Sequence, residues 1–175
     1  MTATGAPKAP QPTAPEPTTW LTDDEQRTWR ALLAFVARLD RDLDRQLQQD
    51  AGMPHAYYMV LAMLSEAPGG RLRMSDLAEI TASSPSRLSH AVARLEDKGW
   101  VRRERHPTDR RGSLAVLTED GLDIVRAVAP GHVAAVRAAV FDRLTTAEVL
   151  RMGALFQALT EDDGVLRVPT GDSLT

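Results

Sequence analysis

The length and composition of the chain favour one globular domain with appendages. Its 175 residues are enough to bury a sizeable core, and a hydrophobic content of 43% excludes a fully disordered polypeptide. There is no cysteine, which excludes disulfides, thiolate zinc sites and thiol-based redox sensing. No apolar run approaches the ~20 residues that span a bilayer, and residues 1–17 lack the apolar segment of a secretory signal. We therefore expect a cytoplasmic protein with no membrane partner.

The distribution of charge is more informative than its total. The net charge of −3 alone argues against a nucleic-acid partner. Between Pro85 and Ala115, however, eight basic side chains face four acidic ones, a local charge of +4 that leaves −7 on the rest of the chain. Because phosphate binding is local, a basic island in an acidic chain is the pattern expected of a nucleic-acid interface.

Segments without helical or strand periodicity lie at both ends of the chain. Residues 1–19 contain five prolines among alanine, threonine and glutamine, and residues 163–175 are similarly irregular. Such segments cannot bury enough apolar area to offset their ordering entropy. We expect a disordered N-terminal arm and a flexible tail, neither of which carries chemistry.

Two helices are predicted after the arm, over residues 22–51 and 54–67. Thr22 and Glu25 have the spacing of a capping box, and apolar residues then recur at helical spacing. Gly52 ends the first helix, and the proline that follows suits the first turn of the second.

A helix-turn-helix pattern comes next. After a short extended piece at 71–73, Ser75 is the predicted cap of a short helix over residues 76–81. A tight polar turn leads to a second helix, with Ser84 as its cap and Pro85 in its first turn. Its core-facing residues are Leu88, Val92 and Leu95.

The periodicity then changes from helical to extended. Residues 100–105 and 113–117 read as two strands, and the turn-rich residues 106–112 between them predict a β-hairpin. Thr118 caps a further long helix, in which we expect a kink or break at Pro130–Gly131.

The last predicted helix, like the first, carries a stripe of apolar residues. Thr145 and Glu148 form a second capping box, followed by an apolar stripe. The central block is too far away in sequence to cover the stripes of both terminal regions. We expect them to pack against the same helices of a second copy. A monomeric bundle that closes on itself is the alternative.

Five segments, in this order and spacing, resemble the MarR family of bacterial transcription regulators. They are Leu77-Ala78-Glu79, Ser86-Arg87-Leu88-Ser89, residues 94–101 (RLEDKGWV), residues 103–111 (RERHPTDRR) and residues 117–121 (LTEDG). The resemblance extends from Leu21 to Leu159. It implies a homodimer that binds a pseudo-palindromic operator and, as in many members, releases DNA when a small, often aromatic, acid binds. Trp100 and His90 depart from the usual residues of the family, which leaves the fold intact and changes the expected operator.

The expected fold is mainly α: a winged helix-turn-helix domain with a two-stranded β-wing, flanked by N- and C-terminal dimerisation helices. The expected divisions are an N-terminal arm (1–19), an N-terminal dimerisation helix (20–52), the winged helix-turn-helix DNA-binding domain (53–118), C-terminal dimerisation helices (119–162) and a tail (163–175).

The second helix of the helix-turn-helix is the predicted recognition helix. In this motif the outward, N-terminal side chains read base edges in the major groove. Arg87 is the best candidate for a bidentate contact to guanine, and Ser86 and Ser89 suit hydrogen bonds to phosphate or base. For Arg94, pairing with a neighbouring carboxylate is an open alternative. The predicted DNA-binding residues here are Ser84, Ser86, Arg87, Ser89, His90 and Arg94.

The hairpin turn indicates a DNA contact more clearly than the recognition helix does. Arg110 and Arg111 stand in a turn, where no ladder of ion pairs along a helix explains them. Asp109 can brace Arg111 while an arginine enters the minor groove, whose potential attracts a guanidinium. A solvated basic loop is the alternative. The predicted DNA-binding residues of the wing are Arg103, Arg105, Asp109, Arg110 and Arg111.

No pattern in the sequence predicts a cofactor, a metal site or a catalytic group. The four histidines lack metal-ligand spacing, and there is no Gly-rich phosphate loop, nucleophile elbow or close carboxylate pair. A small amphipathic or aromatic effector, if one acts, is expected between the long helices and the DNA-reading domain. The candidate effector-binding residues are Trp29, Arg30, His55, Tyr57 and Tyr58.

These features favour a homodimeric, sequence-specific transcription regulator that binds double-stranded DNA, a repressor rather than an activator. A winged-helix module that binds other proteins and has lost DNA binding is the alternative. It predicts a neutral recognition face, which the basic island contradicts. An enzyme ranks third, because no catalytic constellation is visible.

Overall fold

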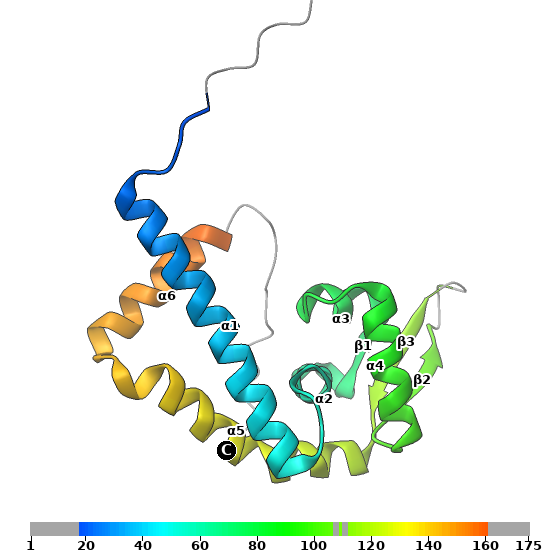
Figure 1. Cartoon of the computed structure of the whole chain (residues 1–175). Coiled ribbons are helices and arrows are strands. Elements are labelled where there is room, and N and C mark those ends of the chain that lie inside the picture. Colours follow the sequence, from blue (N-terminus) through cyan, green and yellow to red (C-terminus); the bar gives the residue numbers. More distant parts are fainter. Residues whose placement is uncertain (1–17, 107–108, 110–111, 161–175) are drawn as a thin grey trace, which may run out of the picture. The chain divides into compact units, whose positions relative to one another are not determined.

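The computed structural model describes residues 18–106, 109 and 112–160 (Figure 1). Contacts between residues divide the chain inside its first helix into two units, Met1–Phe35 and Val36–Thr175. The expected N-terminal arm, apart from Thr18 and Thr19, lies outside the described residues, and so does the expected tail.

The described part of the chain contains six α-helices and one small antiparallel sheet. In chain order these are α1 (Asp23–Ala51), α2 (His55–Glu66), β1 (Arg71–Arg73), α3 (Met74–Ile80), α4 (Pro85–Asp97), β2 (Val101–Arg105), β3 (Ser113–Leu117), α5 (Glu119–Ala139) and α6 (Thr146–Thr160), with 3₁₀ turns at Pro68–Gly70 and Phe141–Arg143. The order confirms the predicted mainly α fold around a winged helix-turn-helix.

Side-chain caps fix where most of the helices begin. The predicted capping contacts that form are Thr22–Glu25 for α1, Ser84–Arg87 for α4, Thr118–Gly121 for α5 and Thr145–Glu148 for α6. The predicted cap at Ser75 is wrong. Helix α3 begins earlier, directly after Arg73, and the Ser75 hydroxyl donates to the Asp76 carboxylate at 2.8 Å.

The sheet has three strands, whereas the sequence predicted a wing of two. Its strand order is β1-β3-β2, and Ala115 of β3 lies between Leu72 of β1 and Arg103 of β2. Three residues are too few for an alternating pattern to reveal β1 as a strand. Strand β3 is the central strand, and its buried middle residues are covered from both sides.

The core of the unit Val36–Thr175 is built around α2. Helix α2 contacts α4, α5 and β3, and α4 in turn contacts α3 and β2. The predicted core face of α4 is confirmed, because its three apolar residues are buried. The largest fully buried side chains are Leu47, Met53, Leu61, Leu64, Leu77, Leu88 and Leu95. With this face in the core, the opposite face of α4 is left to solvent.

The start of α5 is fixed to the turn between α4 and β2. A Cβ atom added at Gly121 would lie 2.1 Å from the carbonyl oxygen of Trp100, so this glycine permits a very close approach. The Thr118 hydroxyl donates to the carbonyl oxygen of Gly99 at 2.8 Å. These contacts join the end of the recognition helix, the base of the wing and α5.

Helix α5 continues through Pro130 to Ala139, so a break at this position does not occur. Proline lacks the N–H that would bond the carbonyl of Arg126, but the helix is preserved on both sides. By length and composition alone, Glu119–Arg143 is the one helix among the described residues that could cross a bilayer, and a single helix of this kind is weak evidence of a membrane span.

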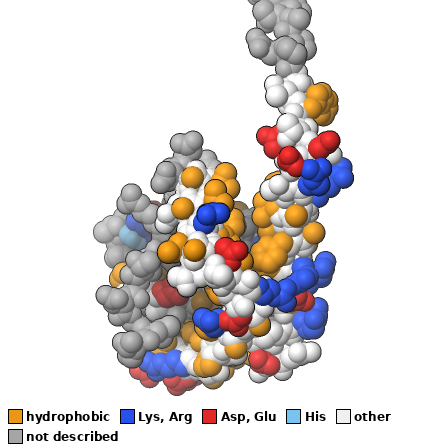
Figure 2. Space-filling view, turned by 90° about the vertical axis from the view of Figure 1, so that its left-hand side faces the viewer, with side chains coloured by type: hydrophobic (Ala, Val, Ile, Leu, Met, Phe, Trp, Pro, Cys, Tyr) orange, Lys and Arg blue, Asp and Glu red, His pale blue; other side chains and the backbone are white. Residues whose placement is uncertain are grey.

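The terminal helices leave large apolar side chains uncovered. The exposed residues are Trp29, Leu32, Leu33, Phe35 and Val36 in α1, and Leu150, Leu155, Phe156 and Leu159 in α6. No residue of α6 is buried. Figure 2 shows hydrophobic side chains at the surface among charged ones. The predicted apolar stripes are therefore present and lack a cover within the described residues.

Candidate nucleic-acid interface

Helix α4 presents all six predicted recognition residues to solvent. Ser84, Ser86, Arg87, Ser89, His90 and Arg94 are exposed. The Ser84 hydroxyl accepts the backbone N–H of Arg87 at 3.3 Å, which fixes the N-terminus of the helix in the open. A helix N-terminus favours negative charge, so this end of α4 suits a phosphate or another anion.

Arg87 is free to bind a partner. It forms no ion pair with any residue in the described ranges. Arg94 differs, because its guanidinium lies 3.7 Å from the Asp97 carboxylate. Both side chains of that pair are more than half exposed, so the pair is weak and does not prevent Arg94 from reaching DNA.

The arginines of β2 have three different environments. Arg102 pairs with Glu104 inside the strand at 2.6 Å. Arg103 pairs with Glu96 of α4 at 3.3 Å. Arg105 forms no ion pair within the described part of the chain and is exposed near the hairpin turn. Arg105 is therefore the described arginine of β2 that is available to a phosphate.

Asp109 is held at the base of the hairpin turn. Its carboxylate lies 3.7 Å from the guanidinium of Arg73 in β1, and its backbone N–H donates to His106 Nδ1 at 3.2 Å. The Gly112 N–H donates to the Asp109 carbonyl at 2.9 Å. Arg110 and Arg111 lie outside the described residues, so the predicted brace from Asp109 to Arg111 stays a prediction.

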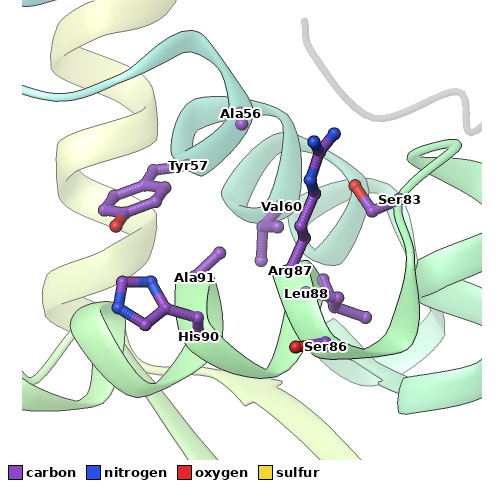
Figure 3. A pocket seen from close by; sticks show the side chains of 9 residues that line it. All are labelled: Ala56, Tyr57, Val60, Ser83, Ser86, Arg87, Leu88, His90 and Ala91. Atoms are coloured by element: carbon purple, nitrogen blue, oxygen red, sulfur yellow. The ribbon is translucent and has the colours of Figure 1, made fainter.

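A cavity of about 530 Å³ opens between α2 and α4 (Figure 3). Its lining residues are Ala56, Tyr57, Val60, Ser83, Ser86, Arg87, Leu88, His90 and Ala91. No carboxylate is among them, whereas Arg87 contributes a positive charge and His90 a titratable ring. Figure 3 shows both side chains extending from α4 along the cavity. The arrangement suits a small anion with an apolar ring.

The three predicted effector residues of the unit Val36–Thr175 have two different surroundings, and the effector site as a whole stays a prediction. Tyr57 lines the cavity. His55 and Tyr58 instead contact His132 of α5, with ring centroids 5.5 Å and 4.5 Å from that of His132. Trp29 and Arg30 belong to the unit Met1–Phe35, where Arg30 donates to Gln26 at 3.0 Å.

His132 lies in a polar cluster that the sequence did not reveal. Its Nδ1 is 3.4 Å from the side-chain oxygen of Gln46 in α1. Burial and the neighbouring His55 lower the pKa of His132 below its usual value. No group of three histidine or carboxylate side chains in the described ranges could hold a metal ion. The cluster therefore joins α1, α2 and α5 through ring contacts and the approach of His132 to Gln46.

Sequence reasoning missed other residues of this region. Val60 and Ser83 line the cavity, yet their patterns are those of an ordinary core residue and a turn residue. Glu96 belongs to the segment 94–101, which resembles the MarR family, but its contact with Arg103 depends on how β2 packs against α4. Arg73 reaches the wing only because β1 is a strand of the sheet.

Comparisons with known proteins identify the family and the fold. The MarR family model matches residues 51–112. Sco3205, a MarR family transcriptional regulator from Streptomyces coelicolor solved in complex with DNA, is 48% identical with a TM-score of 0.80, over 89% of this chain and 98% of that one. AbsC, a MarR family transcriptional regulator from the same organism, is 44% identical with a TM-score of 0.77, over 83% of this chain and 97% of that one.

A curated relative matches over a shorter region. The transcriptional regulator HosA of Escherichia coli O111:H- is 34% identical over 73 residues. The aligned part is 42% of this chain and 53% of HosA, so this match spans about half of that relative. The similarity to Sco3205 and AbsC, by contrast, covers almost the whole of both regulators. The chain belongs to the MarR family of transcriptional regulators.

Proposed function

We propose that this chain is a homodimeric, sequence-specific DNA-binding protein that represses transcription in the cytoplasm and is not an enzyme. The observation that carries the proposal is the exposed N-terminal half of α4, where Arg87 forms no ion pair with a described residue. The complex of Sco3205 with DNA, at 48% identity over 98% of that chain, supports the same use of the fold.

In the proposed complex, α4 lies in the major groove with its first turns towards the bases. The guanidinium of Arg87 pairs with O6 and N7 of a guanine, and Ser86 bonds a neighbouring base or phosphate. The N-terminus of α4, capped by Ser84, faces the phosphate backbone. Base contacts from α4 then supply specificity, and phosphate contacts supply most of the affinity.

The wing makes the second DNA contact of the proposed complex. Arg105 approaches a phosphate from the exposed end of β2. Arg110 and Arg111 at the tip of the wing enter the minor groove, where the negative potential favours a guanidinium. Asp109, held by Arg73 and the backbone of the turn, fixes the base from which the tip extends.

The proposed dimer covers the apolar residues of the terminal helices. Burying one such side chain contributes about 1.5–3 kcal/mol, so a series of them in α1 and α6 strongly favours association. A second copy is a better cover than a bilayer, because charged residues are interspersed along α1. A two-fold dimer requires a pseudo-palindromic operator whose half-sites are about 10 base pairs apart, or a small multiple of this.

The cavity between α2 and α4 is the proposed effector site. Its apolar wall, with Val60 and Leu88, and its cationic Arg87 fit a small aromatic carboxylate. A carboxylate bound to Arg87 withdraws the guanidinium from the base edge, so ligand and operator exclude each other there. Benzoate and salicylate should release DNA and raise the melting temperature, whereas benzamide, which lacks the charge, should not. Release by the amide and the acids alike would contradict the role of Arg87.

Selection of bound DNA from a random pool tests the main proposal. We expect enrichment of an inverted repeat with the half-site spacing given above. The alternative, a winged-helix module that binds proteins, predicts no enriched sequence. Enrichment of single, unrepeated sites would instead contradict the two-fold arrangement while leaving DNA binding intact.

A further inference from the structure

One arginine joins the strand β2 to the helix α4. The backbone N–H of Arg103 donates to Glu96 Oε1 at 3.0 Å, and its guanidinium Nε lies 3.3 Å from Glu96 Oε2. Through Nη2 the same guanidinium donates to the Ser89 carbonyl oxygen at 2.7 Å and to the Ser89 hydroxyl at 3.3 Å. Arg103 therefore holds both oxygens of one carboxylate and reaches α4 at a second place.

The two contacts on α4 are well separated along the helix. Ser89 lies in the first half of α4 and Glu96 in its last turn. At a rise of 1.5 Å per residue, the two positions are roughly 10 Å apart along the axis. A strand that is fixed to a helix at two such points restrains both the tilt and the sliding of the helix. Ser89 is also close in sequence to Arg87, the proposed base-reading residue.

The geometry of β2 turns Arg103 towards α4 and away from the outer face of the wing. Side chains alternate along a strand, so Arg103 shares a face with Val101, which is buried. The side chains of Arg103 and Glu96 are about a third exposed, so water screens this ion pair, and its role rests on the geometry of the several contacts. Arg102, on the other face, pairs with Glu104 inside β2 instead.

We propose that Arg103 is a positioning residue that fixes the wing against the recognition helix, with Glu96 and Ser89 as its partners, rather than a phosphate contact. The inference rests on the proposed DNA binding. The contacts of Nε and Nη2 with α4 set the distance between the helix in the major groove and the wing tip in the minor groove. Without them the two elements move independently, and ordering them on DNA costs affinity.

The proposal is tested by measuring how well variants bind the selected operator. The variants are R103A, R103K, E96A and the double variant R103A/E96A, and R102A is the matched control. Affinity is measured by fluorescence anisotropy over a series of salt concentrations. R103A, which removes the contacts with both Glu96 and Ser89, should weaken binding on the order of tenfold, and E96A by no more than that. The double variant should bind as weakly as R103A, because R103A already removes the contact with Glu96. The slope of log Kd against log salt should stay as in the wild type, since no phosphate contact is lost.

The lysine variant R103K and the control R102A distinguish a positioning role of Arg103 from a phosphate contact. R103K should bind as weakly as R103A, because an ammonium cannot hold a carboxylate and a carbonyl in the fork geometry of a guanidinium. R102A should bind like the wild type. If Arg103 contacted a phosphate instead, the results would be reversed. R103A would flatten the slope of log Kd against log salt by ~1, and R103K would bind like the wild type. E96A, which removes an acidic charge, would bind DNA more tightly than the wild type. That pattern would overturn the proposal.

A measurement without DNA separates this proposal from the proposed function. In a double-mutant cycle on urea unfolding, Arg103 and Glu96 should be coupled, and additive effects would contradict the contact. Circular dichroism of each variant shows whether it is folded. A wild-type protein that enriches no DNA would contradict the proposed function, and the unfolding cycle would still decide whether Arg103 holds the wing.

Discussion

Arg87 occupies the position on which both proposed activities depend. It lies in the first turn of α4, is exposed, and has no ion pair with a described residue. It also lines the cavity beside α2, together with His90. A guanine edge and a ligand carboxylate cannot both engage the same donors of one guanidinium. Substitution of this residue should therefore affect specific binding far more than general attraction to DNA.

The variant R87A tests this expectation. Its affinity for the selected operator should fall by about 1–3 kcal/mol, and its affinity for random DNA much less, because the bidentate contact exists only on the cognate site. R126A is the control, since Arg126 is an exposed arginine of α5 with a local partner, Asp123. Titrations of both DNAs at one salt concentration give the comparison. An equal loss on every sequence would show that the first turns of α4 do not read the bases.

His132 makes the stability of the fold sensitive to mild acid. Its pKa is lowered from the usual 6.5 by burial and by His55, so the unfolded chain takes up this proton at a higher pH than the folded chain. The free energy of unfolding should therefore fall as the pH drops through 6.5 towards the lowered pKa. The other groups that face the ring are Tyr58 of α2 and Gln46 of α1.

Urea unfolding of H132Q between about pH 7 and pH 5 measures this effect. The variant should lose part of the pH dependence of the wild type. H90Q is the matched control, because His90 is exposed on α4, and it should keep the full dependence. Identical pH profiles for the wild type and H132Q would contradict the assignment.

Helix caps are the residues that the sequence predicts best, because a capping contact joins two residues that are at most four positions apart. The capping contact of Ser84 with Arg87 is an example. Ser75 fails because its neighbour Asp76 takes its hydroxyl. Arg103, in contrast, was predicted to touch DNA because it belongs to a basic wing. Its partners on α4 lie seven and fourteen positions earlier, and only the packing of a strand on a helix brings them together.

At the scale of elements, the tightest packing joins the start of α5 to the turn after α4. In G121A the new Cβ would lie 2.1 Å from the Trp100 carbonyl oxygen, so the backbone must move. We expect a loss of about 1–3 kcal/mol in the free energy of unfolding. G153A is the control: apart from its chain neighbours and the backbone of its own helix, no described atom lies within 4 Å of the added Cβ, and the change should stabilise α6 by up to ~1 kcal/mol. Chemical denaturation that lowered the stability of both variants equally would contradict the docking of α5.

Helical periodicity located each α-helix of the described chain, because the buried positions of a helix recur within one turn. The extended piece predicted at 71–73 is strand β1, but its place in the sheet was not predicted, since three residues have no period of their own and pair with β3 only through the fold. At Pro130 a kink or break was predicted, and the break does not occur. Pro130 costs α5 one hydrogen bond, but Val125 and Val128 pack in the core just before it, and the helix continues.

For the molecule as a whole, the exposed apolar residues divide the chain by function. Among the described residues, no large hydrophobic side chain between Val36 and Val133 is exposed. The helix-turn-helix and its sheet therefore close their own core. The exposed large hydrophobic residues lie before and after this region, just before and in α1, in the second half of α5 and the turn after it, and in α6. In the proposed dimer, the helix-turn-helix therefore closes its core within one chain, and the terminal helices are the elements that a second copy covers.

Light scattering at micromolar concentration should give a mass close to twice 19.1 kDa. F156D places a charge among the exposed apolar residues of α6 and should shift the protein towards the monomer without altering its helical content. Operator affinity should then fall steeply, because two half-sites are no longer bound by one particle. Q157D adds the same charge at a neighbouring polar position and should remain dimeric. A wild-type mass of 19.1 kDa would contradict the two-fold arrangement, and a dimeric F156D would move the interface away from this face of α6.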